Sequence, residues 1–174
     1  MATPTHTLAE INALDREGFT ALLGGLFEHS PWIAAAGWHA RPFATIEALH
    51  GALCAIMYDA PPEQQLALIQ AHPDLVARVA RTDRLTPAAI GERAAAGLDR
   101  LDPEEARRFE QLNAAYWARF GFPFVICARE SEKAHILAGF AARLGNGRAA
   151  EIATALGEIA KISRLRLLDI AREG

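Results

Sequence analysis

The chain has 174 residues, of which 51% are hydrophobic and 22% are charged, and its formal net charge is -3. This length and hydrophobic content are typical of a compact domain with a sizeable core, and they exclude a disordered chain. The small negative charge and the scattered arginines give no electrostatic reason to expect a nucleic-acid partner or an anionic membrane surface.

Four helices are predicted in the first half of the chain. They are expected at residues 8–13, 16–29 and 45–58, and from residue 62 to the residue before Pro73. In the third helix, Ile46, Leu49 and Leu53 recur at helical spacing. Pro73 ends the fourth helix, because a residue that precedes proline is pushed out of the α region. His72 therefore lies at a forced helix end.

Four more helices are predicted in the second half. They are expected at residues 87–96, 103–120, 131–144 and 148–172. Thr86 and Asp102 each precede a proline, which is the arrangement of an N-cap followed by proline at the first helical position. Ser131 is the expected N-cap of the helix that ends at residue 144, and Gly121 ends the helix at residues 103–120.

The segment from Phe122 to Cys127 is the one stretch that the sequence predicts to be extended. It is too short and too closely flanked by Gly and Pro to be a helix, and no other segment offers it a pairing partner. We therefore predict an all-α fold, a single-domain bundle of about eight helices that covers residues 1–174.

Arg166 is a cation on the apolar side of the last predicted helix. A step of about 100° per residue places it on one stripe with Leu156 and Ile159, whereas Lys161 and Arg172 fall on the opposite side. A buried guanidinium keeps its proton and needs acceptors for its donors. An internal carboxylate or a bound ligand would satisfy it, and both alternatives stay open on the sequence.

Glu92 lies among small residues at helical spacing, including Ala88, Ala89, Ala95 and Ala96. A carboxylate on a closely packed small-residue face would be desolvated, which would raise its pKa and suit it to proton transfer or hydrogen bonding. The alternative is an exposed glutamate in the first turns of its helix, where the helix dipole favours negative charge.

His72 is separated from Asp74 only by Pro73. A neighbouring carboxylate and a helix C-terminus both favour the imidazolium and would hold the pKa of His72 near the working pH. The alternative is a surface or capping histidine. An imidazole, a carboxylate and a guanidinium on one helical scaffold indicate proton-transfer chemistry on a small anion.

The remaining patterns favour no metal and no nucleotide cofactor. The histidines and cysteines lack the spacing of a metal site, and the sequence has no phosphate-binding glycine loop or nucleophile elbow. Cys54 and Cys127 lie among apolar residues and are expected to be buried free thiols. Since no apolar run approaches the roughly 20 residues of a membrane span and no leader pattern is present, we expect no membrane association and a cytoplasmic protein.

Several segments taken together resemble one known family. They are residues 38–43, 71–75, 96–99, 112–116, 120–129 and 161–167. They occur in this order and spacing in decarboxylases of 2-oxo-4-hydroxy-4-carboxy-5-ureidoimidazoline (OHCU), the last intermediate between urate and allantoin. The segments HPDL, beginning at His72, and FGFPFVICAR, beginning at Phe120, are the most specific. The resemblance covers Ile11 to Leu168.

This resemblance implies an all-helical homodimer that uses neither cofactor nor metal. It implies that His72 is the catalytic acid/base and that Glu92 acts with it by holding N–H groups of the substrate. The substrate-contacting positions that it implies are Pro73, Ala89, Glu92, Arg93, Phe124, Val125, Ile126, Cys127, Ala128 and Arg166. The product expected from OHCU is (S)-allantoin.

The chain departs from the family pattern in one of these segments. The family usually reads Ser-x-x-Glu-Gln, whereas this chain reads Ala89-Ile90-Gly91-Glu92-Arg93. A hydroxyl and an amide are missing and a fixed positive charge is added. Arg93 would pair with the substrate carboxylate, or it would turn outward and leave its place to water.

Two other functions remain alternatives. The first is a divergent enzyme that acts on a related ureido or hydroxy acid, which the departures at Ala89 and Arg93 would favour. The second is a non-catalytic helical interaction module, in which Arg166 and Glu92 would be paired internally.

Overall fold

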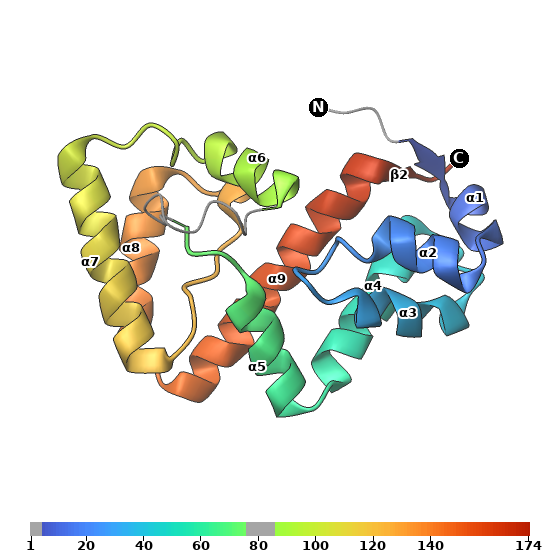
Figure 1. Cartoon of the computed structure of the whole chain (residues 1–174), viewed down its shortest axis with the longest axis horizontal. Helices are drawn as coiled ribbons and strands as arrows, with labels where there is room; N and C mark the ends of the chain where they lie inside the picture. The colour runs from blue at the N-terminus through green and yellow to red at the C-terminus, as the bar shows by residue number, and fades with distance from the viewer. Residues whose placement is uncertain (1–4, 76–85) are drawn as a thin grey trace. The chain divides into compact units, whose positions relative to one another are not determined.

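The computed structural model describes residues 5–75 and 86–174. Within these residues the regular secondary structure is helical apart from two short strands, which confirms the predicted all-α fold (Figure 1). The elements in chain order are β1 (His6–Thr7), α1 (Leu8–Ala13), α2 (Arg16–Leu23), α3 (Pro31–Gly37), η1 (Trp38–Ala40), α4 (Ile46–Asp59), α5 (Pro62–Ala71), α6 (Pro87–Ala95), α7 (Pro103–Phe120), η3 (Ala128–Glu130), α8 (Lys133–Arg143), α9 (Arg148–Ile170) and β2 (Ala171–Arg172). The two η elements are short 3-10 helices.

Five helices begin and end close to their predicted positions because local signals define their ends. Thr45 and Thr86 are the N-caps of α4 and α6, and their hydroxyls accept backbone N–H groups of the first turn. Asp102 caps α7 in a capping box with Glu105. Gly121 ends α7 in the left-handed conformation, with φ of 77°. The other two predicted in this way are α1 and α5.

The second predicted helix is wrong in its length. Helix α2 ends at Leu23 rather than at residue 29, because Gly24 and Gly25 are poor helix formers and follow directly. The chain then turns through residues 24–30 and begins α3 at Pro31, a helix that the sequence analysis did not predict. Proline suits this first helical position because its missing N–H would have no partner there.

Smaller differences occur near the other helix ends. Glu132, not Ser131, is the N-cap of α8, and its side chain makes no capping hydrogen bond. Helix α9 ends at Ile170, and the next two residues form strand β2, which pairs in parallel with β1. With α3 included, the described residues contain nine α-helices where about eight were predicted.

The chain divides into two compact units. Unit 1 comprises Met1–Leu68 and Ala160–Gly174, and unit 2 comprises Ile69–Ile159. The divisions fall within α5 and α9 rather than in linkers. The single domain over residues 1–174 stays a prediction, supported by this continuity of the two helices.

Unit 1 packs α2 against α3 and α3 against α4. Its fully buried apolar side chains include Ile11, Phe19, Leu23, Ile33, Leu49, Leu53, Met57 and Leu167. A polar contact between α4 and α9 is made by His50, whose Nε2 lies 3.0 Å from the Ala160 carbonyl oxygen and 3.1 Å from Ser163 Oγ. Cys54 is buried beside this histidine, as predicted for a free thiol.

Unit 2 places α7 beside α8, as the yellow and orange helices show (Figure 1). Its core is an aromatic cluster around Tyr116, which is fully buried. The rings of Phe120, Phe122 and Phe124 surround it at centroid distances of 4.6, 5.9 and 5.3 Å. Phe124 also stacks on Phe140 at 3.8 Å. This cluster buries one side of the extended segment that follows α7.

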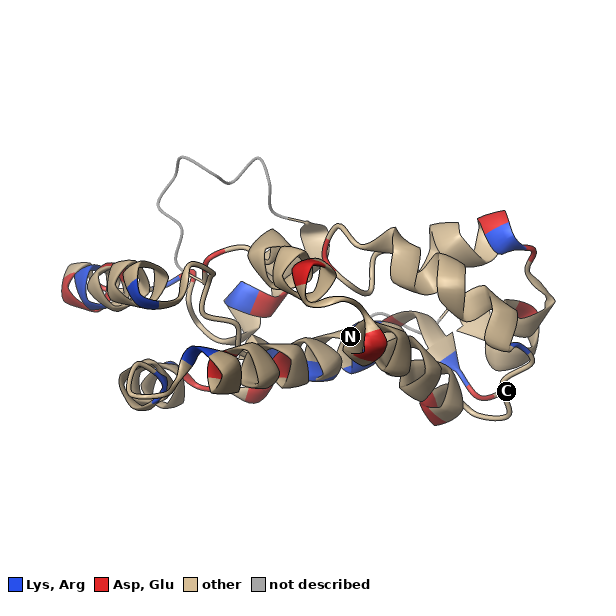
Figure 2. Ribbon diagram, turned by 90° about the horizontal axis from the view of Figure 1, so that it is seen from below, with Lys and Arg blue, Asp and Glu red and all other residues tan. Residues whose placement is uncertain are grey.

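Lys and Arg residues and Asp and Glu residues are both scattered over the described helices, among long stretches of other residues (Figure 2). Among the described residues, none of the helices combines the length and apolar character that crossing a bilayer requires.

Candidate active site

His72 follows the last residue of α5, as the proline rule predicts. The residue is only 7% exposed, and its backbone N–H donates to the Ile69 carbonyl over 3.2 Å. Two neighbours attach this turn to the end of α7. Gln70 Nε2 donates to the Gly121 carbonyl oxygen at 3.0 Å, and Asp74 Oδ1 accepts the indole N–H of Trp117 at 2.6 Å. The structure thus confirms the predicted position of His72 at the helix end and shows that the residue is buried, with Pro73 half-buried beside it.

Helix α6 carries Ala89, Glu92 and Arg93. Ala89 is 4% exposed, whereas Glu92 and Arg93 are half-buried. Burial lowers the pKa of the Arg93 guanidinium from its ordinary value. The small-residue face predicted around Glu92 is buried only in part, because Ala88 and Ala95 are exposed. Glu92 is therefore neither sealed in the core nor fully solvated.

The stretch Phe124–Ala128 is buried along its whole length and lies outside regular helix or strand until η3 begins at Ala128. Its backbone is partly used: the carbonyl oxygens of Cys127 and Ala128 accept the N–H groups of Glu130 and Ser131 at 3.1 Å, and two further backbone groups bind side chains. The Val125 carbonyl accepts a hydrogen bond from Arg143 Nη1 at 2.7 Å, and the Cys127 N–H donates to Glu158 Oε2 at 2.8 Å. Between these anchors, the N–H and C=O of Ile126 form no hydrogen bond with the described residues.

Helix α6 and the end of this stretch lie together within unit 2. Helix α6 packs against η3. The Cys127 thiol is buried, and burial, followed by nearby carboxylates that include Glu92, raises its pKa to about 11. A thiol with this pKa stays protonated near neutral pH, so Cys127 contributes packing and backbone groups rather than a nucleophile.

Arg166 is 6% exposed, which confirms its predicted burial on α9. Its Nη2 donates to Glu28 Oε1 at 2.8 Å, and Nη1 lies 3.4 and 3.5 Å from the carbonyl oxygens of Gly25 and Leu26. The internal carboxylate that the sequence left open is therefore Glu28, itself 2% exposed. These groups belong to unit 1, and an approach of Arg166 to the residues of unit 2 stays a prediction.

Comparison with known proteins identifies the family. The OHCU decarboxylase family pattern matches residues 12–168. This chain belongs to the OHCU decarboxylase family. It is 42% identical over 163 residues to the OHCU decarboxylase of Amia calva, covering 94% of this chain and 93% of that protein. The mouse (Mus musculus) OHCU decarboxylase is 40% identical over 163 residues, covering 94% and 92%.

A crystal structure of (S)-allantoin synthase has the same fold. It superposes with a TM-score of 0.74 at 29% identity and covers 95% of this chain. This chain spans about half, 54%, of the length of that protein.

Four residues that hold the Phe124–Ala128 stretch of this OHCU decarboxylase family member were not predicted from the sequence. They are Tyr116, Arg143, Glu151 and Glu158. Arg143 lies in the last turn of α8 and Glu151 in the first turn of α9, where these charges favour the helix dipole and are ordinarily exposed. Sequence position therefore gave no sign that these two charges are buried.

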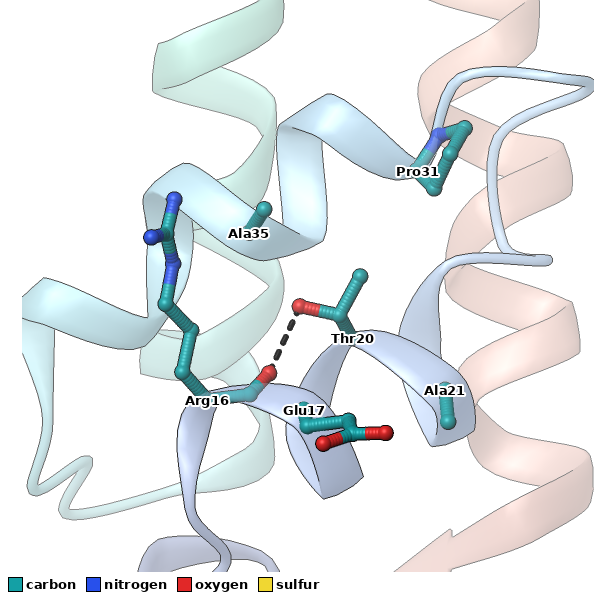
Figure 3. Close-up of a pocket in the computed structure, with 6 residues that line it drawn as sticks. All are labelled: Arg16, Glu17, Thr20, Ala21, Pro31 and Ala35. Atoms are coloured by element: carbon teal, nitrogen blue, oxygen red, sulfur yellow. Dashed lines mark hydrogen bonds between the residues drawn. The ribbon is translucent and has the colours of Figure 1, made fainter.

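A surface hollow of about 650 Å³ lies over α2 and α3 in unit 1 (Figure 3). Its lining residues are Arg16, Glu17, Thr20, Ala21, Pro31 and Ala35. The Thr20 hydroxyl donates to the Arg16 carbonyl within α2 at 2.7 Å, so it is used inside its own helix. None of the predicted site residues lines this hollow. The described residues contain no cluster of three or more His, Cys, Asp or Glu side chains able to hold a metal ion.

Proposed function

We propose that this protein decarboxylates OHCU to (S)-allantoin, the last step in the degradation of urate to allantoin. The observation that carries the proposal is the buried His72 at its helix end, in a chain that the family pattern matches from residue 12 to residue 168. A buried imidazole is suited to move a proton without exchange with bulk water.

The substrate itself supplies the electron sink of the reaction. In OHCU the carboxylate and a hydroxyl share one ring carbon, next to a C=N bond. When the carbon–carboxylate bond breaks, its electron pair moves into the C=N, whose nitrogen takes up a proton. The resulting enol-like intermediate loses the hydroxyl proton and gains a proton on the adjacent carbon, which gives allantoin. The protein must orient the ring and manage these protons.

We assign the proton transfers to His72. It accepts the hydroxyl proton and delivers a proton to one face of the intermediate, which sets the (S) configuration. Glu92 holds ring or ureido N–H groups as an acceptor. The backbone of Phe124–Ala128 holds the remaining polar edge, with Pro73 and Ala89 forming apolar contacts. The binding role of this backbone is supported by Ile126, which is buried and whose N–H and C=O form no hydrogen bond within the described residues.

The two arginines are assigned to the negative charge of the substrate. Half-buried Arg93 is not fully turned to solvent, and its charge would pair with the substrate carboxylate. Arg166 would compensate anionic charge in addition to its bond with Glu28. We also propose that the protein is a homodimer in the cytoplasm. Sedimentation of the purified protein tests the dimer, and a monomer at working concentration would contradict it.

His72→Ala and His72→Gln test the central assignment. General acid–base catalysis typically accelerates a reaction about 10²–10⁴-fold, so kcat should fall by about this factor or more. His135→Ala, which changes an exposed histidine of α8, is the matched control and should keep wild-type activity. OHCU made freshly from urate is followed by its absorbance, and the product by the circular dichroism of (S)-allantoin. Near-normal production of (S)-allantoin by folded His72→Ala would rule out this role.

A related ureido or hydroxy acid is the second candidate substrate, and the half-buried Arg93 favours it. Arg93→Gln restores the residue usual in the family. If OHCU is the substrate, Arg93→Gln should retain decarboxylation, with KM changed by less than about tenfold. A wild-type protein that leaves OHCU unchanged, next to an Arg93→Gln protein that converts it, would favour the divergent enzyme.

A further inference from the structure

Arg143 holds the Phe124–Ala128 stretch through two adjacent residues. Its Nη1 donates to the Val125 carbonyl at 2.7 Å, and its guanidinium carbon lies 4.2 Å from the centroid of the Phe124 ring. The side chain is only 11% exposed. A hydrogen bond from a charged donor and a cation–π contact act here on consecutive residues. The arginine therefore constrains the direction of the Val125 carbonyl and the distance of the Phe124 ring from α8.

Arg143 is itself held in place by a buried carboxylate. Glu151 is 0% exposed and accepts hydrogen bonds from three donors. These are Arg143 Nε at 2.9 Å, Asn146 Nδ2 at 2.8 Å and the Tyr116 hydroxyl. Burial, followed by the hydrogen bond to Glu151, raises the pKa of Tyr116, so its hydroxyl stays a donor. Arg143 Nη2 lies 3.4 Å from the same hydroxyl. A network satisfied in this way fixes the orientation of its members.

The two anchors act on consecutive peptide planes. In a trans peptide, the C=O and the following N–H lie in one rigid plane and point in opposite directions within it. The bond from Arg143 to the Val125 carbonyl therefore also sets the direction of the Ile126 N–H. In the next plane, the bond from the Cys127 N–H to Glu158 sets the direction of the Ile126 C=O. The polar groups at the far ends of both planes are thus the donor and the acceptor of a single residue, Ile126.

We propose that Arg143, fixed by Glu151 and Tyr116, is a positioning residue that orients the backbone of Ile126 for the substrate. This inference rests on the proposed function, in which the stretch binds the polar edge of OHCU. A ureido or ring amide group offers one N–H and one C=O, which complement the C=O and N–H of Ile126. Without Arg143, this non-helical backbone would sample other directions of the Ile126 N–H and C=O. Substrate binding would then include the entropic cost of ordering these two groups.

Arg143→Lys is the test variant, because lysine reaches one partner as a point charge but cannot bridge Val125 and Glu151 with a planar fork. Arg148→Lys is the matched control. Arg148 also donates to a backbone carbonyl, that of Phe120 at 3.2 Å, and lies 5.6 Å from the Phe122 ring centroid, but it contacts a part of the chain before the Phe124–Ala128 stretch.

Three measurements are made on the full chain. They are amide hydrogen exchange of the peptide covering residues 122–129, KM and kcat for OHCU, and the Kd of (S)-allantoin by calorimetry. Arg143→Lys should speed exchange in this peptide and raise KM and Kd about tenfold, the size expected for one lost hydrogen bond to a charged group. Arg148→Lys should leave all three within about twofold of wild type.

Tyr116→Phe serves as the second, milder variant if Arg143→Lys does not fold. It removes only the hydroxyl and should raise KM and Kd about threefold, with the same local increase in exchange. A variant that lowers Tm but leaves KM, Kd and exchange of residues 122–129 unchanged shows a purely structural role and overturns the inference. Equal effects of Arg143→Lys and Arg148→Lys overturn it as well. A wild-type protein that does not decarboxylate OHCU contradicts the proposed function instead, and the exchange result then decides the positioning role by itself.

Discussion

Two non-helical stretches of this protein are built alike but carry their charges differently. Residues 24–30 follow α2 in unit 1, and residues 121–127 follow α7 in unit 2; each begins with glycine. Each is held by a buried arginine that points an Nη atom at its carbonyl groups, Arg166 in the first and Arg143 in the second. The carboxylate partner of Arg166 is Glu28, which belongs to the stretch itself, whereas that of Arg143 is Glu151 of the distant helix α9.

This difference distinguishes a structural turn with its own counter-charge from a stretch whose backbone polar groups remain available to bind a ligand. The first stretch contains its own counter-charge, so the arginine and the turn satisfy one another. The second contains no charged side chain, and its Val125 carbonyl is bound by Arg143 of α8, which is held in turn by Glu151 of α9 and Tyr116 of α7. Because the anchoring side chains come from outside the stretch, the polar groups that it leaves free among the described residues include the backbone N–H and C=O of Ile126.

The largest expected effect comes from removing either carboxylate. Glu28→Ala and Glu151→Ala each leave a buried guanidinium without its partner, which should lower the free energy of unfolding by about 3–5 kcal/mol. Glu151→Ala should be the more damaging, because Tyr116 and Asn146 lose their acceptor as well. Urea unfolding at pH 7 measures both.

Glu47→Ala is the control for these two variants. Its partner Arg164 lies at 2.8 Å, but the Glu47 side chain is 63% exposed, so the change should be below about 1 kcal/mol. A loss for Glu28→Ala as small as this would contradict the account of a buried, coupled pair.

Replacing both partners by apolar residues should distinguish the two stretches. Glu28→Leu with Arg166→Met should recover most of the stability lost in Glu28→Ala, because a buried ion pair adds little over well-packed apolar groups. Glu151→Leu with Arg143→Met should stay about 2 kcal/mol or more below wild type, since Tyr116 and the Val125 carbonyl remain without partners. Equal recovery in urea unfolding would show that the second network is no more extensive than the first.

The two glycines should respond differently to substitution. Gly121 has φ of 77° and open space where a Cβ would lie, so Gly121→Ala should cost about 1 kcal/mol through backbone conformation, and Gly121→Asn less. At Gly24 a Cβ would lie 2.5 Å from the Thr20 carbonyl oxygen and 3.1 Å from Pro31 Cβ, so the cause there is steric and Asn should be no better than Ala. Thermal unfolding of the four variants provides the comparison.

The smallest effect expected is a pH dependence confined to unit 1. Burial lowers the pKa of His50 below its ordinary value of 6.5, so the folded state disfavours the proton. Above pH 6.5 the histidine is neutral in both states and makes no difference. As the pH falls through 6.5 toward the folded pKa, the unfolded state binds the proton first and stability declines, by less than about 1 kcal/mol for this half-exposed group. Urea midpoints at pH 7.5 and 5.5 should therefore differ less in His50→Gln than in wild type.

The sequence could predict what depends on local signals. Caps and prolines define α4, α6 and α7, and the periodicity of α9 identifies Arg166 as a buried cation, since its neighbours on the stripe are apolar. Arg143 and Glu151 could not be found in this way, because their burial depends on α7, α8 and the segment after α7 packing together. The end of α2 at Leu23 has a local signal in Gly24 and Gly25, but the burial of residues 26–28, which adds to it, depends on tertiary packing.

The division of the chain has a consequence for its synthesis. Unit 2 is one continuous segment, Ile69–Ile159, whereas unit 1 needs its final residues, Ala160–Gly174, to be complete. As the nascent polypeptide leaves the ribosome, the segment that contains His72 can collapse while the earlier α2–α4 helices still await the end of α9. The parallel pairing of His6 with Ala171 is then among the last contacts to form.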